Sequence, residues 1–66
     1  MTLQEFLNEL KHKSINISLC YENGSFIYAA TLGELIHWVH YQEFATLIVD
    51  MVTPTASQMY IYLEEE

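Results

Sequence analysis

Hydrophobic and polar residues follow two different periods along this chain. Two stretches place apolar residues three to four positions apart, as an amphipathic helix does, and each stretch precedes a region of alternating apolar and polar residues. Alternation with a period of two is typical of half-buried strands. The succession of these patterns predicts the element order α-β-β-α-β-β.

The first helical pattern covers residues 2–13. Thr2 and Glu5 have the spacing of a capping box, in which each side chain bonds the other residue's backbone N–H, so the helix is expected to begin after Thr2. A second helix is predicted over residues 31–41, with Thr31 and Glu34 as its capping box. Each helix has one apolar stripe, formed by Leu3, Phe6, Leu7 and Leu10 in the first and by Leu32, Leu35, Ile36 and Val39 in the second.

Strands over residues 15–21 and 26–30 are predicted to form a tight hairpin. Asn23-Gly24 between them is typical of a type I′ turn, which needs a positive φ at both central positions. A two-residue loop would place six apolar side chains on one face, in the pairs Tyr21–Phe26, Leu19–Tyr28 and Ile17–Ala30.

A second hairpin is predicted from strands over residues 44–52 and 58–63, joined by a five-residue loop from Thr53 to Ser57. This loop would pair Met51 with Met59. One face would then form the core, with Leu47, Val49, Met51, Met59, Ile61 and Leu63. The opposite face is too apolar for comfortable exposure to water and holds Thr46, Ile48, Asp50, Val52, Tyr60 and Tyr62.

These elements predict a single α+β domain over residues 1–66. It would be a two-layer sandwich of a four-stranded, mainly antiparallel sheet with both helices on one face and the strand order 2-1-3-4. The two helical sequences align with each other, so the chain can be read as two αββ half-repeats, residues 2–30 and 31–64. The alternative is that any two capped amphipathic helices look this similar.

Composition limits the possible functions. The chain has 66 residues, 52% of them hydrophobic, and a net charge of −7, with Lys11 and Lys13 as its only Lys or Arg residues. So few cations argue against binding nucleic acid or an anionic membrane. One cysteine, Cys20, excludes an internal disulfide, so the surplus apolar surface predicts a homodimer or larger homo-oligomer. A free thiol and the absence of a signal-peptide pattern favour the cytoplasm, or the host cell cytoplasm for a phage protein.

No pattern of catalytic or metal-binding residues is evident. Glu34, His37 and His40 are spaced by three on the second helix, but a carboxylate-bridged metal site needs matching ligands from other helices. Cys20 has no activating partner nearby in the sequence, and no carboxylate pair suggests acid–base catalysis. The sequence therefore predicts a non-enzymatic protein without metal or cofactor.

Two surfaces are candidates for binding a partner. The first is the outer sheet face, represented by Ile48, Asp50, Tyr60 and Tyr62, where Glu22, Asp50 and Glu64 would gather at the rim. The second is the outer side of the second helix, represented by Glu34, His37, Trp38 and Tyr41. Aromatic residues surrounded by charged ones are common at binding hot spots. On the alternative interpretation, Trp38 covers the sheet edge and the outer sheet face is buried in a homodimer.

The function hypothesis is a small acidic binding protein. Its size and charge suit a phage or mobile-element inhibitor that blocks a host nucleic-acid-handling or defence protein by occupying its basic groove. Two alternatives remain open: an antitoxin that holds a basic toxin, and a homo-oligomeric structural or assembly module. An inhibitor of this kind needs acids gathered on one face, whereas an assembly module needs only the apolar patch.

Overall fold

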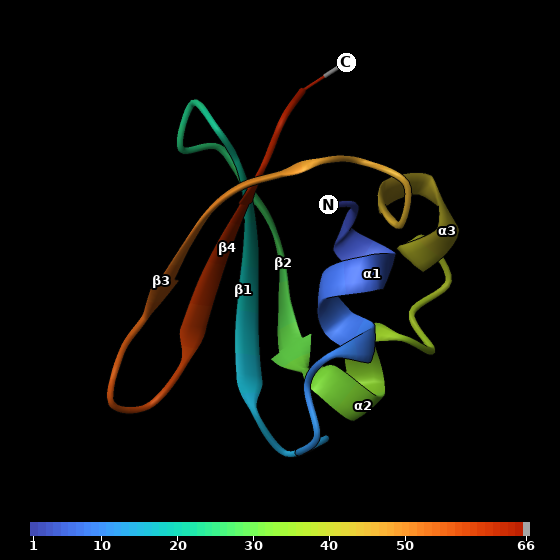
Figure 1. Ribbon diagram of the computed structural model, residues 1–66, viewed down its shortest axis with the longest axis vertical. Helices are drawn as coiled ribbons and strands as arrows, with labels where there is room; N and C mark the ends of the chain where they lie inside the picture. The colour runs from blue at the N-terminus through green and yellow to red at the C-terminus, as the bar shows by residue number, and fades with distance from the viewer. Residues whose placement is uncertain (66) are drawn as a thin grey trace.

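A computed structural model of the protein describes residues 1–65. Its elements are α1 (Leu3–Asn8), β1 (Asn16–Tyr21), β2 (Phe26–Thr31), α2 (Leu32–Leu35), α3 (Tyr41–Phe44), β3 (Val49–Pro54) and β4 (Met59–Leu63). The four strands form one sheet in the order β2-β1-β4-β3. Figure 1 shows the three short helices gathered beside β1 and β2, while the β3–β4 hairpin extends away from them. The α+β architecture and the mainly antiparallel sheet were predicted correctly.

The predicted strand order 2-1-3-4 is wrong, because β4 and not β3 lies beside β1. The β1–β4 pairing is parallel, whereas β1–β2 and β3–β4 are antiparallel. Composition explains why β3 takes the edge: it carries Asp50, and it ends in Pro54, which cannot donate to a neighbouring strand. β4 instead supplies Ile61 and Leu63, both fully buried, and so occupies the centre.

The core lies between the helices and the inner face of the sheet. Its largest fully buried side chains come from a helix, from the two central strands and from the short α2 helix, namely Leu3, Ile17, Leu19, Leu35, Ile61 and Leu63. The first helical stripe, the second stripe except for Val39, and both central strands therefore contribute to one continuous core.

Both predicted capping boxes are present. Thr2 accepts a hydrogen bond from the Glu5 N–H while the Glu5 carboxylate accepts one from the Thr2 N–H, and Thr31 and Glu34 form the same pair. Next to the first box, the Leu3 N–H donates to the Leu47 carbonyl at 2.9 Å. The start of α1 is thereby fixed to the segment before β3.

The second helix is shorter than predicted and is interrupted. α2 ends with Ile36 as its C-cap, and a new turn of helix begins at Tyr41. The segment between them contains histidine, tryptophan and valine, which have lower helix propensity than alanine or leucine. The break has a structural consequence, because it turns Trp38 over the inner face of β2, where its ring stacks on Tyr28 with the centroids 4.0 Å apart.

The first hairpin has the predicted register in its middle but a different turn. Among the described residues only Gly24 has a positive φ, of 92°, so Asn23 does not adopt the conformation that a type I′ turn requires. The Gly24 N–H donates to the Tyr21 carbonyl at 2.8 Å. The loop is therefore three residues long, with its last residue left-handed, and the type I′ prediction is wrong.

A bulge beside this turn changes one face assignment. Leu19 pairs with Tyr28 as predicted, but the next pair is Cys20–Phe26, because one extra residue of β2 is accommodated here. Phe26 thus lies opposite Cys20 on the outer face and is 67% exposed, whereas the predicted register placed it opposite Tyr21, on the same face as Leu19.

The second hairpin is shifted from its predicted register. Met59 pairs with Pro54, and Met51 pairs with Tyr62. The turn is closed by Thr55, whose side-chain hydroxyl accepts from the Gln58 N–H at 3.0 Å and donates to the Gln58 carbonyl at 2.8 Å. Because the shift is an odd number of residues, Met51 moves to the outside and is 52% exposed.

Candidate functional site

An apolar row crosses the outer sheet face, defined as the face that points away from the helices. The strand pairings place Phe26, Cys20, Tyr62 and Met51 side by side, one from each of the four strands. Phe26 and Met51, at the two edges, are exposed, whereas Cys20 in the middle is buried between its neighbours. We call these four residues the apolar row.

Tyr60 lies in the next row of the same face and is held by hydrogen bonds. The Ser18 hydroxyl donates to Gln58 Oε1 at 2.9 Å, and Gln58 Nε2 donates to the Tyr60 hydroxyl at 2.8 Å. The first of these hydrogen bonds gives the buried Ser18 hydroxyl an acceptor. It also fixes Tyr60 in one orientation beside Tyr62, so both tyrosines of the predicted sheet-face site are part of the outer face.

Three carboxylates converge at one end of this face. One oxygen each of Glu22, Asp50 and Glu64 lies within 4.8 Å of the others, and all three residues are exposed. Backbone bonds bring their segments together: the Glu22 N–H donates to the Leu63 carbonyl at 2.8 Å, and the Glu64 N–H donates to the Ile48 carbonyl at 2.9 Å. Three like charges this close create a negative potential that attracts cations, including lysine and arginine side chains.

Two further acids, which the sequence did not associate with these three, lie at the same end. Glu43 and Glu65 line a hollow of about 280 Å³ together with Tyr21, Phe44 and Leu47. We call the group Glu22, Glu43, Asp50, Glu64 and Glu65 the acidic end. Glu43 reaches it because the break in the second helix places α3 there, a break that the helical period of the sequence did not indicate.

Ile48, the remaining sheet-face candidate, lies at the acidic end and not in the sheet. It forms an isolated bridge with Thr2, just before β3 begins, and is 41% exposed. An exposed branched side chain next to Asp50 adds apolar surface to the charged end. Of the four sheet-face candidates, Tyr60 and Tyr62 thus lie on the outer sheet face, Asp50 belongs to the carboxylate cluster, and Ile48 lies outside the sheet.

The helix-face candidates are not brought together on one surface. Trp38 stacks between Tyr28 and Phe44, with the Phe44 centroid at 5.5 Å. Tyr41 is buried, which raises the pKa of its hydroxyl. His37 stays exposed, but the most exposed apolar residue of this segment is Val39 at 84%, which the sequence had assigned to the apolar stripe.

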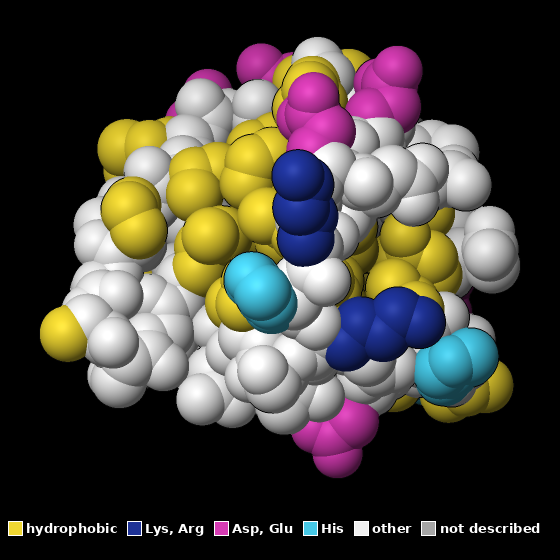
Figure 2. Space-filling model, turned by 60° about the horizontal axis from the view of Figure 1, so that its bottom comes forward, with side chains coloured by type: hydrophobic (Ala, Val, Ile, Leu, Met, Phe, Trp, Pro, Cys, Tyr) yellow, Lys and Arg dark blue, Asp and Glu magenta, His cyan; other side chains and the backbone are white. Residues whose placement is uncertain are grey.

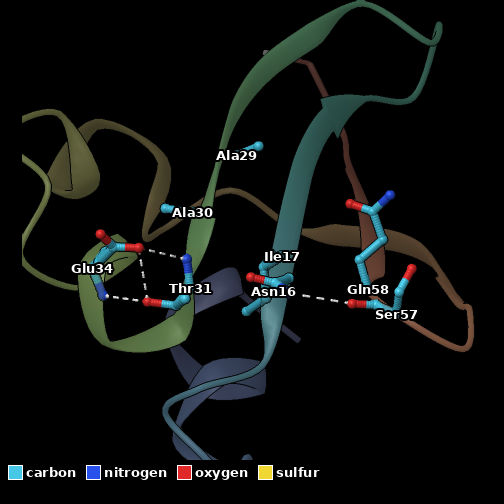
Figure 3. Close-up of a pocket in the computed structure, with 8 residues that line it drawn as sticks. All are labelled: Asn16, Ile17, Ala29, Ala30, Thr31, Glu34, Ser57 and Gln58. Carbon is cyan, nitrogen blue, oxygen red and sulfur yellow. Dashed lines mark hydrogen bonds between the residues drawn. The ribbon is translucent and has the colours of Figure 1, made fainter.

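Glu34, the fourth helix-face candidate, borders a hollow near the first residues of β1 and β4. This end of the two strands is the one farther from the carboxylate cluster. Figure 3 shows this hollow, of about 400 Å³, with the Glu34 carboxylate turned toward Thr31 and Asn16 Nδ2 donating to the Ser57 carbonyl at 3.4 Å. Among residues 1–65, Glu34 is the only ionisable residue that lines this hollow.

The bonds to Glu34 lead to a prediction about pH. The Thr31 N–H and hydroxyl donate to its carboxylate at 3.1 and 3.0 Å, and these bonds lower the pKa of Glu34 below its ordinary value of 4.5. A carboxylate with a lowered folded-state pKa stabilises the fold above its unfolded-state pKa and loses this effect as the pH falls through the folded-state value. The stability difference between wild type and Glu34→Ala should accordingly shrink as the pH falls below 4.5. Urea titrations between neutral pH and pH 3 measure it, and a difference that stays constant would contradict a role of the ionised carboxylate.

No family model, curated protein or solved structure matches this chain in comparisons with known proteins. The structure shows a small α+β protein, and none of the helices within residues 1–65 is long and apolar enough to cross a membrane.

Proposed function

We propose that this chain is a small non-enzymatic protein that binds a basic protein partner through its acidic end and the adjoining apolar row. The observation that carries the proposal is the position of the charges. Three carboxylates cluster at one end of the molecule, and Glu43 and Glu65 line a hollow beside them, with Glu43 also in contact with His40. Phe26 and Met51 are exposed on the adjoining outer face. Both lysines of the sequence lie elsewhere, beside a hollow between α1 and α2.

Such a surface suits a partner whose own surface is basic. The acids attract the partner over several ångströms and speed association, while aromatic and apolar side chains provide the contact area that slows dissociation. Basic grooves are typical of proteins that handle nucleic acid. The proposed role is therefore inhibition of a nucleic-acid-handling or defence protein by occupying that groove, as a phage or mobile-element protein would do.

The partner can be sought among proteins that bind heparin, which selects basic surfaces. A bacterial lysate is fractionated on heparin, the bound proteins are passed over the immobilised chain, and retained proteins are identified and purified. We expect the retained protein to lose its binding to DNA or RNA when the chain is added. A retained protein that keeps full nucleic-acid binding would contradict inhibition by occupancy of the basic groove.

With the purified partner, two variants distinguish the charge attraction that speeds association from the side-chain contacts that slow dissociation. Asp50→Lys is expected to slow association about tenfold at low salt, because it reverses a charge within the carboxylate cluster. Tyr62→Ala is expected to speed dissociation about tenfold, because it removes the centre of the apolar row. Surface plasmon resonance at several salt concentrations measures both rates.

The control for charge is Glu9→Lys, which makes the same change in net charge at an exposed position where α1 ends. It should leave both rates close to those of the wild type. If Glu9→Lys slowed association as much as Asp50→Lys, overall charge and not the acidic end would govern binding, and the proposed site would be wrong.

A further inference from the structure

The two lysines border an apolar groove between the end of α1 and α2. The groove has a volume of about 270 Å³, and its floor is formed by Leu7, Leu10, Leu32 and Ile36. Lys11 and Lys13 stand at its rim, and none of the carboxylates of residues 1–65 lines it. Figure 2 turns this part of the molecule toward the viewer and shows both lysines, in dark blue, next to yellow hydrophobic side chains.

This groove is the part of the surface best suited to an anion. The sequence contains two Lys or Arg residues against nine Asp or Glu residues, and both of these cations are here. Within residues 1–65 the ion pair that forms is His40–Glu43, so neither lysine is paired with a carboxylate of these residues. The groove therefore combines unpaired positive charge with an apolar floor.

The same chain carries the matching surface at its other end. Glu22, Asp50 and Glu64 cluster there, with the exposed side chains of Ile48 and Met51 nearby. In Figure 1, where the longest axis is vertical, α2 lies near the bottom and the end of β4 near the top. The longest dimension is 29 Å, so one molecule cannot bring its own two surfaces into contact.

We propose that copies of this chain associate head to tail, with the acidic end of one copy seated on the lysine groove of the next. The contact pairs Lys11 and Lys13 with the carboxylate cluster and covers apolar side chains on both copies. It is heterologous, because the two surfaces differ, and each added copy leaves one surface of each kind free. Association therefore continues into rings or short chains and does not stop at a symmetric dimer.

Net charge does not prevent this contact at physiological salt. Each copy carries a charge of −7, so copies repel each other at long range. The screening length at physiological ionic strength is about 8 Å, which is shorter than the molecule's 29 Å axis. Charges at the distant ends are largely screened, while lysines and carboxylates in direct contact still attract. Self-association should accordingly be strongest near physiological salt and weaken in 1 M salt.

Two double variants test the proposal. Lys11→Glu/Lys13→Glu reverses the groove, and Asp50→Lys/Glu64→Lys reverses the acidic end; all four positions are exposed, so both variants should fold. Sedimentation velocity of the wild type up to a few hundred micromolar should show species larger than a monomer. Each variant alone should show at least a tenfold weaker self-association. An equal mixture should assemble again, because each variant offers the surface that complements the other.

The mixture distinguishes this arrangement from a symmetric dimer and from damage to the fold. A wild type that remains monomeric throughout this range would overturn the proposal. So would a groove variant that assembles as the wild type does, or a mixture that stays as monomeric as its components while circular dichroism shows both to be folded. None of these measurements involves a partner protein, so they are independent of the function proposed above.

Discussion

Replacing Ile61 by alanine is expected to destabilise the protein by about 2–5 kcal/mol, which is comparable to the whole stability of a domain this small. Ile61 is fully buried in a central strand. It pairs with the equally buried Leu19 on one side and with Val52 on the other. Removing three carbon atoms there leaves a cavity that neighbouring strands cannot close without disturbing the sheet. Circular dichroism during urea titration should show a large loss of the native signal at 25 °C.

Met51→Ala is the matched control in the same hairpin. The side chain of Met51 is 52% exposed on the outer face, so its removal should cost well under 1 kcal/mol. If the two variants had similar urea midpoints, the β3–β4 register described above would be wrong. The pair therefore tests the register as well as the core.

Local signals explain which parts of the fold were predictable. The capping boxes at Thr2 and Thr31 need only four consecutive residues each, and both form. The Leu19–Tyr28 pairing follows from a short loop between two alternating strands, and it also forms. These features depend on neighbours in the sequence, where the hydrophobic pattern and the turn residues agree.

The strand order and the second register depend on interactions that the pattern does not specify. Both faces of the β3 sequence are apolar enough to serve as a core face, so hydrophobic alternation alone did not determine which side points inward. A hydrogen bond of Thr55 closes the turn and sets the register. The strand order depends on which strand of the hairpin buries more apolar surface. β4 lies at the centre of the sheet because two of its side chains are fully buried.

The acidic cluster was predicted by a partly wrong argument. With the predicted register, Asp50 would be on the outer face together with Glu22 and Glu64. The shift of the β3–β4 register by an odd number of residues would by itself point Asp50 toward the core. However, β3 has a bulge between Val49 and Met51, in which Asp50 is an extra residue with no partner in β4. Its carboxylate consequently meets those of Glu22 and Glu64 after all. A bulge that aims a charged side chain in this way also protects an edge strand from pairing with another chain.

The break in the second helix could not be predicted from its apolar stripe, which continues through Val39. Tertiary packing favours the interruption, because it allows Trp38 to stack on Tyr28 and Tyr41 to enter the core. The helix-face surface was therefore predicted from a helix longer than the one that forms. The interruption also brings Glu43 to the acidic end, where its carboxylate contacts His40 and lines the same hollow as Glu65.

Replacing Gly24 by valine is expected to destabilise the protein by at least about 1–2 kcal/mol. Gly24 has a φ of 92°, and a Cβ added there would meet nothing within 4 Å. The cost is therefore conformational and does not arise from a clash, because a β-branched residue is strongly disfavoured at positive φ.

Gly24→Asn is the control, since asparagine adopts left-handed conformations more readily than other residues with a side chain. It should lose clearly less stability than Gly24→Val, measured as the shift in thermal midpoint. The bond from the Gly24 N–H to the Tyr21 carbonyl, at 2.8 Å, forms only when the chain reverses at this point. Equal losses for valine and asparagine would show that the backbone at Gly24 is not left-handed. The turn, and the placement of Phe26 on the outer face that follows from it, would then have to be revised.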